Sequence, residues 1–304
     1  MKVPRLFTVL IVFILFGCQP RQQFPARIVL GVVNFGEDEQ LEEVYGELKE
    51  YLETELNSIV ELEPAYNERQ AIAQINNESW DLVFASPGLA AIASQKSAYV
   101  PILSLEGGIN NRSIFVVAED SPLQQLSDLN GKGVALGQAG SATGYYFPLL
   151  NLYGLTLNKI LLAATPKQAL EWIADGEVAA AAMSLEQYNL YRATIPEKKF
   201  RVLHQDTHSV PSGSILVSNR LPQIEQEALY ETLITAPPMI SSSVGYITNA
   251  DVPNYEELIN VIDRVIPITD NIQRQPAMLY EKATEVPSEK TEEGTEVPSE
   301  KTEE

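Results

Sequence analysis

Between residues 27 and 280 the sequence alternates between short apolar runs and longer amphipathic stretches. The runs Arg27–Val33, Leu82–Ser86 and Ile114–Ala118 have the length and apolar content of buried strands. The stretch Glu39–Leu56 places its apolar side chains on one helical face. This alternation predicts βαβ units and mostly parallel sheets covered by helices on both faces. We therefore expect an α/β protein of two lobes of similar size.

The first 18 residues have the layout of a bacterial export signal. Lys2 and Arg5 precede an apolar stretch, Leu6–Phe16, that is too short to span a bilayer comfortably. The only cysteine of the chain, Cys18, follows at once. The sequence LFGC that ends at this cysteine resembles the lipobox of bacterial lipoproteins.

A lipobox implies that residues 1–17 are a signal peptide and that Cys18 becomes the lipidated N-terminus. Residues 18–26 would then form a tether, and the lipid would anchor the protein to a bacterial membrane without spanning it. We expect the protein in the periplasm or at the cell surface. The alternatives are a plain signal peptide and an uncleaved anchor with an incidental cysteine.

The chain is strongly acidic, with 41 Asp and Glu against 21 Lys and Arg and a net charge of −20. This balance argues against a nucleic-acid partner, because binding to a phosphate backbone needs a basic surface. The sequence TEVPSEKTEE occurs at 284–293 and again at 295–304. We expect residues 281–304 to be a disordered acidic tail. A docking segment for a partner is the alternative.

The strongest local signal for a binding site is the segment GQAGSATGYYFP. A strand should end at Gly137 and a helix should begin near Thr143, so unpaired N–H groups and the positive end of the helix dipole meet there. Ser141 and Thr143 add hydroxyl donors, while Ala142 and Gly144 let a ligand approach the backbone. The segment predicts an anion site. An ordinary helix N-cap is the alternative.

Other motifs with a known chemistry are missing from the sequence. No glycine-rich segment has the pattern of a Walker A loop or a dinucleotide-binding fingerprint, and no Gly-x-Ser-x-Gly elbow occurs. His204 and His208 are four residues apart, but they lie in a stretch expected to be a strand followed by a loop. We expect no metal site, no cofactor and no catalytic residues.

Four segments resemble one protein family in their order and motifs. They are SPLQQLSDLNGKGVALGQAGSATGYYFP, WDLVFASPG, ALEWIADGEVAAAAMSLEQY and VPSGSILVSNRLP. Each is similar to a stretch of the phosphonate/phosphate-type periplasmic substrate-binding proteins of bacterial ABC transporters. The resemblance runs from about Arg27 to about Val265.

This resemblance implies a type II periplasmic-binding-protein fold, in which two α/β lobes are joined by a two-stranded hinge with a ligand cleft between them. Lobe I would comprise residues 27–111 plus 215–280, and lobe II residues 112–214. The hinge would lie near Asn110–Ser113 and Pro211–Ser214. Closure of the lobes about this hinge would trap the ligand.

The resemblance also implies which residues bind the ligand. The loop from Ser141 through Gly144 to Tyr145 matches the oxyanion-binding loop of the family, with Ala142 where a hydroxyl residue is usual. From the first lobe, Tyr66 matches a pocket tyrosine. Ala85 and Ser86 fall where the family often has an aromatic and a small residue. The aromatic side chain is missing here, and Ser86 could donate a hydrogen bond in its place.

Two further positions bear on the ligand class. Thr165, or the proline after it, falls where some members have an anion-binding histidine. Glu186 matches one of two acids that hold the amine of aminoalkyl phosphonates, but the second acid would fall near Gly213. We therefore expect a smaller or uncharged-tail oxyanion, such as phosphate, phosphite or methylphosphonate, rather than aminoethylphosphonate. Sulfonates remain an alternative.

The sequence therefore predicts an extracytoplasmic solute-binding lipoprotein, expected to be a monomer, that delivers a small oxyanion to the permease of an ABC importer. A sensor of the same fold, which signals its ligand state to a membrane partner through the acidic tail, is the first alternative. An enzyme on this fold is the second, and it is disfavoured because no cysteine nucleophile, histidine base or metal cluster is evident.

Overall fold

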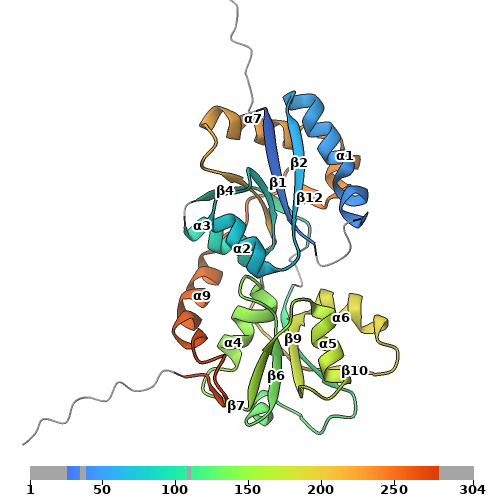
Figure 1. Cartoon of the computed structure of the whole chain (residues 1–304), viewed down its shortest axis with the longest axis vertical. Helices are drawn as coiled ribbons and strands as arrows, with labels where there is room; N and C mark the ends of the chain where they lie inside the picture. The colour runs from blue at the N-terminus through green and yellow to red at the C-terminus, as the bar shows by residue number, and fades with distance from the viewer. Residues whose placement is uncertain (1–25, 35–38, 97, 108–110, 281–304) are drawn as a thin grey trace, which may run out of the picture.

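The computed structural model describes residues 26–34, 39–96, 98–107 and 111–280. The predicted signal peptide, lipidated Cys18 and acidic tail lie outside these residues, as does the tether except for Ala26. Two sheets lie one above the other in Figure 1, each with its own set of helices. The predicted fold class of two α/β lobes is confirmed.

The first sheet has the strand order β12-β4-β11-β3-β1-β2. Its strands are β1 (Arg27–Val33), β2 (Ile59–Ala65), β3 (Leu82–Ala85), β4 (Tyr99–Leu105), β11 (Ser214–Ser218) and β12 (Tyr246–Ile247). Helices cover both faces, because side chains on both faces of the central strands are apolar. One face carries α1 (Glu39–Leu56), α7 (Gln223–Ile234) and α8 (Pro238–Ser243), and the other carries α2 (Glu68–Asn76) and α3 (Pro87–Gln95).

The second sheet has the order β10-β5-β9-β6-β8. Its strands are β5 (Ser113–Ala118), β6 (Gly133–Leu136), β8 (Lys159–Leu162), β9 (Ala180–Ser184) and β10 (Phe200–Gln205). The helices α5 (Pro166–Ala174) and α6 (Leu185–Tyr191) cover one face. The other face carries a π-helical turn, η2 (Ala142–Tyr146), which continues into α4 (Phe147–Asn151), and also α9 (Glu256–Thr269). Two short 3₁₀ turns complete the lobe, η1 (Leu126–Leu129) and η3 (Arg192–Thr194).

The expectation of mostly parallel sheets is wrong. Parallel pairing is confined to β1 with β2 and β3, and to β6 with β8 and β9. The remaining pairs of the two large sheets are antiparallel. The reason is the route of the chain, which leaves the first sheet from β4 into β5 and returns from β10 into β11. The two strands reached by crossing between lobes, β5 and β11, enter their sheets in the opposite direction, and β12 adds a short antiparallel pair at the edge of the first sheet.

Two segments of chain connect the sheets side by side. Where they meet, Val210 donates its N–H to the carbonyl of Asn111 at 3.0 Å. Tyr255 holds the returning segment, because its hydroxyl donates to the carbonyl of Ser212 at 2.9 Å and lies 2.6 Å from Ser214 Oγ. These contacts lie within the predicted hinge regions, except that Asn110 falls outside the described residues. Movement about them stays a prediction.

The C-terminal part of the chain touches both lobes. Helix α9 contacts α3 of the first lobe and α4 of the second. The strand after it, β13 (Ala277–Met278), pairs with β7 (Thr156–Leu157) of the second lobe. Residues 215–280, assigned to lobe I in the prediction, thus include a strand that pairs with one of residues 112–214, and the lobe boundaries stay a prediction. In the described ranges no helix is long and apolar enough to cross a membrane.

Candidate functional site

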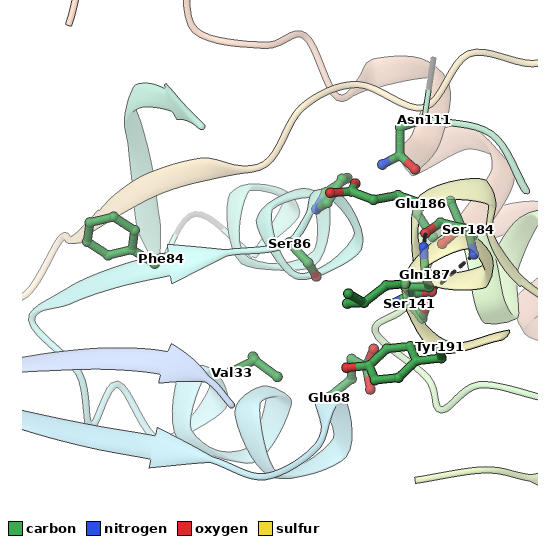
Figure 2. Close-up of a pocket in the computed structure, with 14 residues that line it drawn as sticks. Val33, Glu68, Phe84, Ser86, Asn111, Ser141, Ser184, Glu186, Gln187 and Tyr191 are labelled. Carbon is green, nitrogen blue, oxygen red and sulfur yellow. Dashed lines mark hydrogen bonds between the residues drawn. The ribbon is translucent and has the colours of Figure 1, made fainter. Parts of the chain in front are cut away.

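A cavity of about 350 Å³ lies between the two lobes, where strands of both sheets end (Figure 2). Both lobes and the segment that connects them contribute to its wall. The first lobe and the connection supply Val33, Glu68, Phe84, Ser86, Pro87 and Asn111. The second lobe supplies Ser141, Ala142, Thr143, Ser184, Glu186, Gln187, Leu190 and Tyr191.

The second-lobe wall is built on the start of η2. The first N–H groups of a helix have no carbonyl partner within it, and those of Ala142 and Thr143 occupy this position. Ser141 caps the turn, since its Oγ accepts the N–H of Gly144 at 3.0 Å. Ser113 at the start of β5 holds the loop in place, because its hydroxyl donates a hydrogen bond to the carbonyl of Thr143 at 2.7 Å. The loop is thus held with hydroxyl and N–H donors at the cavity.

The first lobe approaches this loop at a glycine. A Cβ atom added to Gly88 of α3 would lie 2.1 Å from the carbonyl oxygen of Gly140 and 2.8 Å from the backbone nitrogen of Ala142. Only a residue without a side chain permits this approach. Backbone from the two lobes is therefore in direct contact beside the cavity.

Two polar atoms in the cavity wall are buried without a partner. Ser86 Oγ at the end of β3 and Asn111 Oδ1 in the connecting segment form no hydrogen bond with any part of the chain that the structure describes. Ser86 precedes α3 as its N-cap residue, yet its side chain makes no capping bond. Buried polar atoms are normally paired, so these two atoms are available to a ligand in the cavity.

Two carboxylates also line the cavity, and they differ in burial. Glu186 is exposed at the start of α6, whereas Glu68 in the first turn of α2 is only 8% exposed. Burial raises the pKa of Glu68 to about 7, an effect that a hydrogen bond from its own backbone N–H reduces only in part. The wall formed by described residues contains no Lys, Arg or His. A ligand is therefore met by neutral donors and by acids.

The structure brings together five of the residues predicted from the sequence. They are Ser86, Ser141, Ala142, Thr143 and Glu186. Gly144 and Thr165 line a smaller neighbouring pocket of about 20 Å³, which Ser141 and Glu68 also border. Tyr145 and Tyr66 line neither cavity. Whether these nine residues bind a ligand stays a prediction.

Two of the predicted residues, Thr165 and Tyr145, have evident structural roles, and a third, Tyr66, lies largely exposed. Thr165 caps α5, since its Oγ1 accepts the N–H of Gln168 at 3.1 Å. Tyr145 is buried, with its ring centroid 5.1 Å from that of Tyr146 in an edge-to-face pair. Tyr66 is 45% exposed after the end of β2.

Sequence reasoning missed several residues of the cavity wall. Ser184 and Gln187 form a reciprocal capping box at the start of α6. This pattern follows an expected buried strand and could have been recognised. Glu68 and Asn111 gave no comparable signal, because only the tertiary structure brings α2 and the connecting segment to the loop of the second lobe.

The histidine pair forms no metal site in the structure. His204 lies in β10, and His208 Nδ1 is 2.6 Å from Oδ1 of the buried Asp206. Among the residues that are placed, no group of three or more His, Cys, Asp or Glu side chains could hold a metal ion.

The sequence from residue 30 to residue 249 matches the model of one family, described as ABC transporter, phosphonate, periplasmic substrate-binding protein. The chain belongs to this family. Its members are transport proteins that bind a small ligand outside the cytoplasm and interact with a permease. The family is therefore one of substrate-binding proteins and not of enzymes. A search of the curated proteins gave no match.

Several solved structures share this fold. A Xanthomonas citri protein bound to ATP has a TM-score of 0.66 at 21% identity, covering 79% of this chain and 98% of that chain. A Prochlorococcus marinus protein in complex with methylphosphonate has a TM-score of 0.64 at 14% identity, with the same coverage of 79% and 98%. A binding component of a phosphonate ABC transporter from Pseudomonas aeruginosa has a TM-score of 0.62 at 14% identity, covering 78% and 84%.

Proposed function

We propose that this member of the family captures a small oxyanion of the phosphate, phosphite or phosphonate class and delivers it to an ABC importer by closure of its lobes. The observation that carries the proposal is the loop at Ser141–Thr143, whose hydroxyl and N–H donors border the cavity opposite the unpartnered Ser86 Oγ. Oriented backbone N–H groups bind anions even in an acidic protein, because short-range donors outweigh distant, screened charges. The family's description as phosphonate-binding supports the same class.

The proposal has a direct test in thermal unfolding of the purified protein. The panel comprises phosphate, phosphite, methylphosphonate, aminoethylphosphonate, sulfate and taurine. A ligand at a hundred times its dissociation constant stabilises the folded protein by about 2.7 kcal/mol, which raises the unfolding temperature by a few degrees. Stabilisation by a phosphorus oxyanion supports the proposal. Stabilisation by sulfate or taurine alone would contradict the proposed phosphorus class and would indicate a sulfur oxyanion as the ligand.

We also propose that Cys18 carries a lipid that holds the protein at a bacterial membrane, with residues 1–17 removed and residues 18–26 as the tether. The support is the lipobox-like sequence LFGC after an apolar stretch. In cells fed labelled palmitate, the wild-type protein should incorporate the label and sediment with membranes. The Cys18→Ser variant should remain unlabelled, and labelling of that variant would contradict lipidation at this residue.

A further inference from the structure

The carboxylate of Glu68 stands in a cavity that we propose for an anion. Its helix begins after Asn67, whose Oδ1 accepts the N–H of Gln70 at 3.0 Å, so the backbone at Glu68 is fixed by a cap. Glu68 borders both the 350 Å³ cavity and the smaller pocket of the second lobe. In Figure 2 its side chain extends from α2 toward Tyr191 of α6.

Close packing keeps Glu68 at the contact between the lobes. A Cβ atom added to Gly140 would lie 2.8 Å from the Cβ of Glu68, so no free space separates α2 from the loop of the second lobe there. Glu68 is 8% exposed. While the lobes are in this arrangement, the carboxylate faces the cavity rather than bulk water.

The first-lobe elements packed against α2 bring no cation to Glu68. Helix α3 has no titratable side chain, and the basic residue of β1, Arg27, pairs with Glu61 of β2 at 2.5 Å. Glu63, also on β2, accepts a hydrogen bond from Gln74 at 2.7 Å. Arg69 on the same helix as Glu68 is exposed.

The second lobe faces Glu68 across the cavity with one acid and one phenol. These are Glu186 and Tyr191 of α6, which line the same cavity. Lys167 of α5 lies 3.7 Å from Glu171 on the exposed face of that helix. Within the ranges described, no ion pair and no hydrogen bond from another residue reaches the Glu68 carboxylate.

We propose that Glu68 binds the ligand oxyanion in its protonated form, so that ligand capture takes up a proton and weakens as the pH rises above neutrality. This inference rests on the proposed function, and it adds a specificity-determining residue to the site. A protonated carboxyl is a hydrogen-bond donor, whereas an ionised one only accepts and repels an anion. Burial already raises the pKa of Glu68 to about 7, and an anion beside it favours the protonated form further.

The test compares wild type with Glu68→Gln, which keeps a neutral donor of similar shape that cannot titrate. Binding of methylphosphonate and phosphite to the full-length protein in detergent is measured by calorimetry from pH 6 to pH 8. Ionisation of the ligand affects both proteins equally, so it cancels in the ratio of their affinities. Wild type should match the variant at pH 6 and bind up to about tenfold more weakly at pH 8.

Proton uptake gives a second measurement on the wild-type protein, which holds even if the variant fails to fold. Calorimetry in two buffers of different ionisation enthalpy measures how many protons the protein takes up per bound ligand. Wild type should take up as much as one proton more than Glu68→Gln does. If the variant does not fold, the reference is the proton change that the ligand's own ionisation accounts for. Glu43→Gln removes the same charge from an exposed position of α1, outside the cavity wall, and should keep the pH dependence of wild type.

The outcomes separate this inference from the proposed function. Binding with an affinity ratio that stays constant from pH 6 to pH 8, and without excess proton uptake, would overturn the role of Glu68 and leave the proposed function standing. Proton release in excess of the ligand's own ionisation would likewise overturn it. Binding of neither anion at any pH would count against the proposed function itself.

Discussion

Ser86 and Ser113 show how two buried hydroxyl groups near the same loop have opposite roles. Ser86 Oγ has no partner in the described structure, whereas Ser113 Oγ donates to the carbonyl of Thr143. A satisfied hydroxyl stabilises the folded protein, and an unsatisfied one costs desolvation energy until a ligand pairs with it. The first is therefore expected to serve binding and the second to serve the shape of the loop.

Substitution of the two serines should separate binding from stability. Ser86→Ala should leave the unfolding temperature unchanged or higher and weaken oxyanion binding by about tenfold, the value of one hydrogen bond to a charged group. Ser113→Ala should lower the free energy of unfolding by about 1–3 kcal/mol, because the Thr143 carbonyl loses its buried donor. Calorimetric titration and thermal unfolding measure the two effects. Loss of stability in Ser86→Ala would contradict the assignment.

Thr143 should contribute its hydroxyl to the ligand. Thr143→Val keeps the shape of the side chain and removes the donor, so we expect binding to weaken by about tenfold in calorimetric titration. Thr235→Val is a matched control, since it removes a hydroxyl at the exposed end of α7, far in sequence from the cavity wall. Equal affinities in the two variants would show that Thr143 makes no contact.

The pKa of Glu68 predicts how the stability of the ligand-free protein depends on pH. The folded protein holds this proton up to about pH 7, whereas the unfolded chain releases it near pH 4.5. Wild-type stability should therefore fall between these pH values, and Glu68→Gln should escape the loss. We expect the variant to match wild type at pH 4.5 and to exceed it by up to about 3 kcal/mol at pH 8. Glu43→Gln on the exposed face of α1 is the control, and denaturant unfolding is the measurement.

At the scale of elements, the anion loop could be predicted from the sequence because its geometry is local. A buried strand, a small-residue segment and a helix start are adjacent in the chain, and the structure places β6, the loop and η2 in that order. The antiparallel strands could not be predicted in this way. The position of β11 beside β3, rather than at a sheet edge, depends on where the chain re-enters the first sheet from the second lobe. Local sequence patterns do not predict this point of re-entry.

The site shows the same division between local and non-local signals. Ser141, Ala142 and Thr143 share one short segment, and they were predicted together. Asn111 and Glu68 lie in separate parts of the chain, and each meets the loop only through the packing of one lobe on the other. Close approaches between the lobes, such as that of Gly140 to Glu68, determine which residues meet there. A single sequence does not reveal these approaches.

The contact of α3 with the loop gives a prediction at this scale. Gly88→Ala should hold the lobes apart, since the new Cβ would lie 2.1 Å from the Gly140 carbonyl oxygen, and oxyanion affinity should fall. Gly46→Ala in α1 is the matched control, because its Cβ meets only Glu42 Oε2 at 3.7 Å and alanine favours a helix by up to about 1 kcal/mol. The control should bind normally and unfold at a slightly higher temperature. Unchanged affinity of Gly88→Ala, measured by calorimetric titration, would exclude a role of this contact in binding.

At the scale of the whole molecule, the cavity wall is divided between two lobes that two adjacent segments connect. A ligand that contacts both walls stabilises the arrangement in which the walls are close, because it interacts with that arrangement more strongly than with an open one. We therefore expect small-angle scattering to show a smaller radius of gyration with a bound oxyanion than without it. An unchanged radius on binding would mean that the ligand-free protein is already closed.

The central claim is that a phosphorus oxyanion binds between Ser86 of the first lobe and Thr143 of the second. Its most direct test is calorimetric titration of phosphate, phosphite and methylphosphonate into wild type and into the double variant Ser86→Ala with Thr143→Val. The account predicts saturable binding of at least one of these anions to wild type and an affinity about a hundredfold lower in the double variant. No binding to wild type, or equal binding to both proteins, would contradict it.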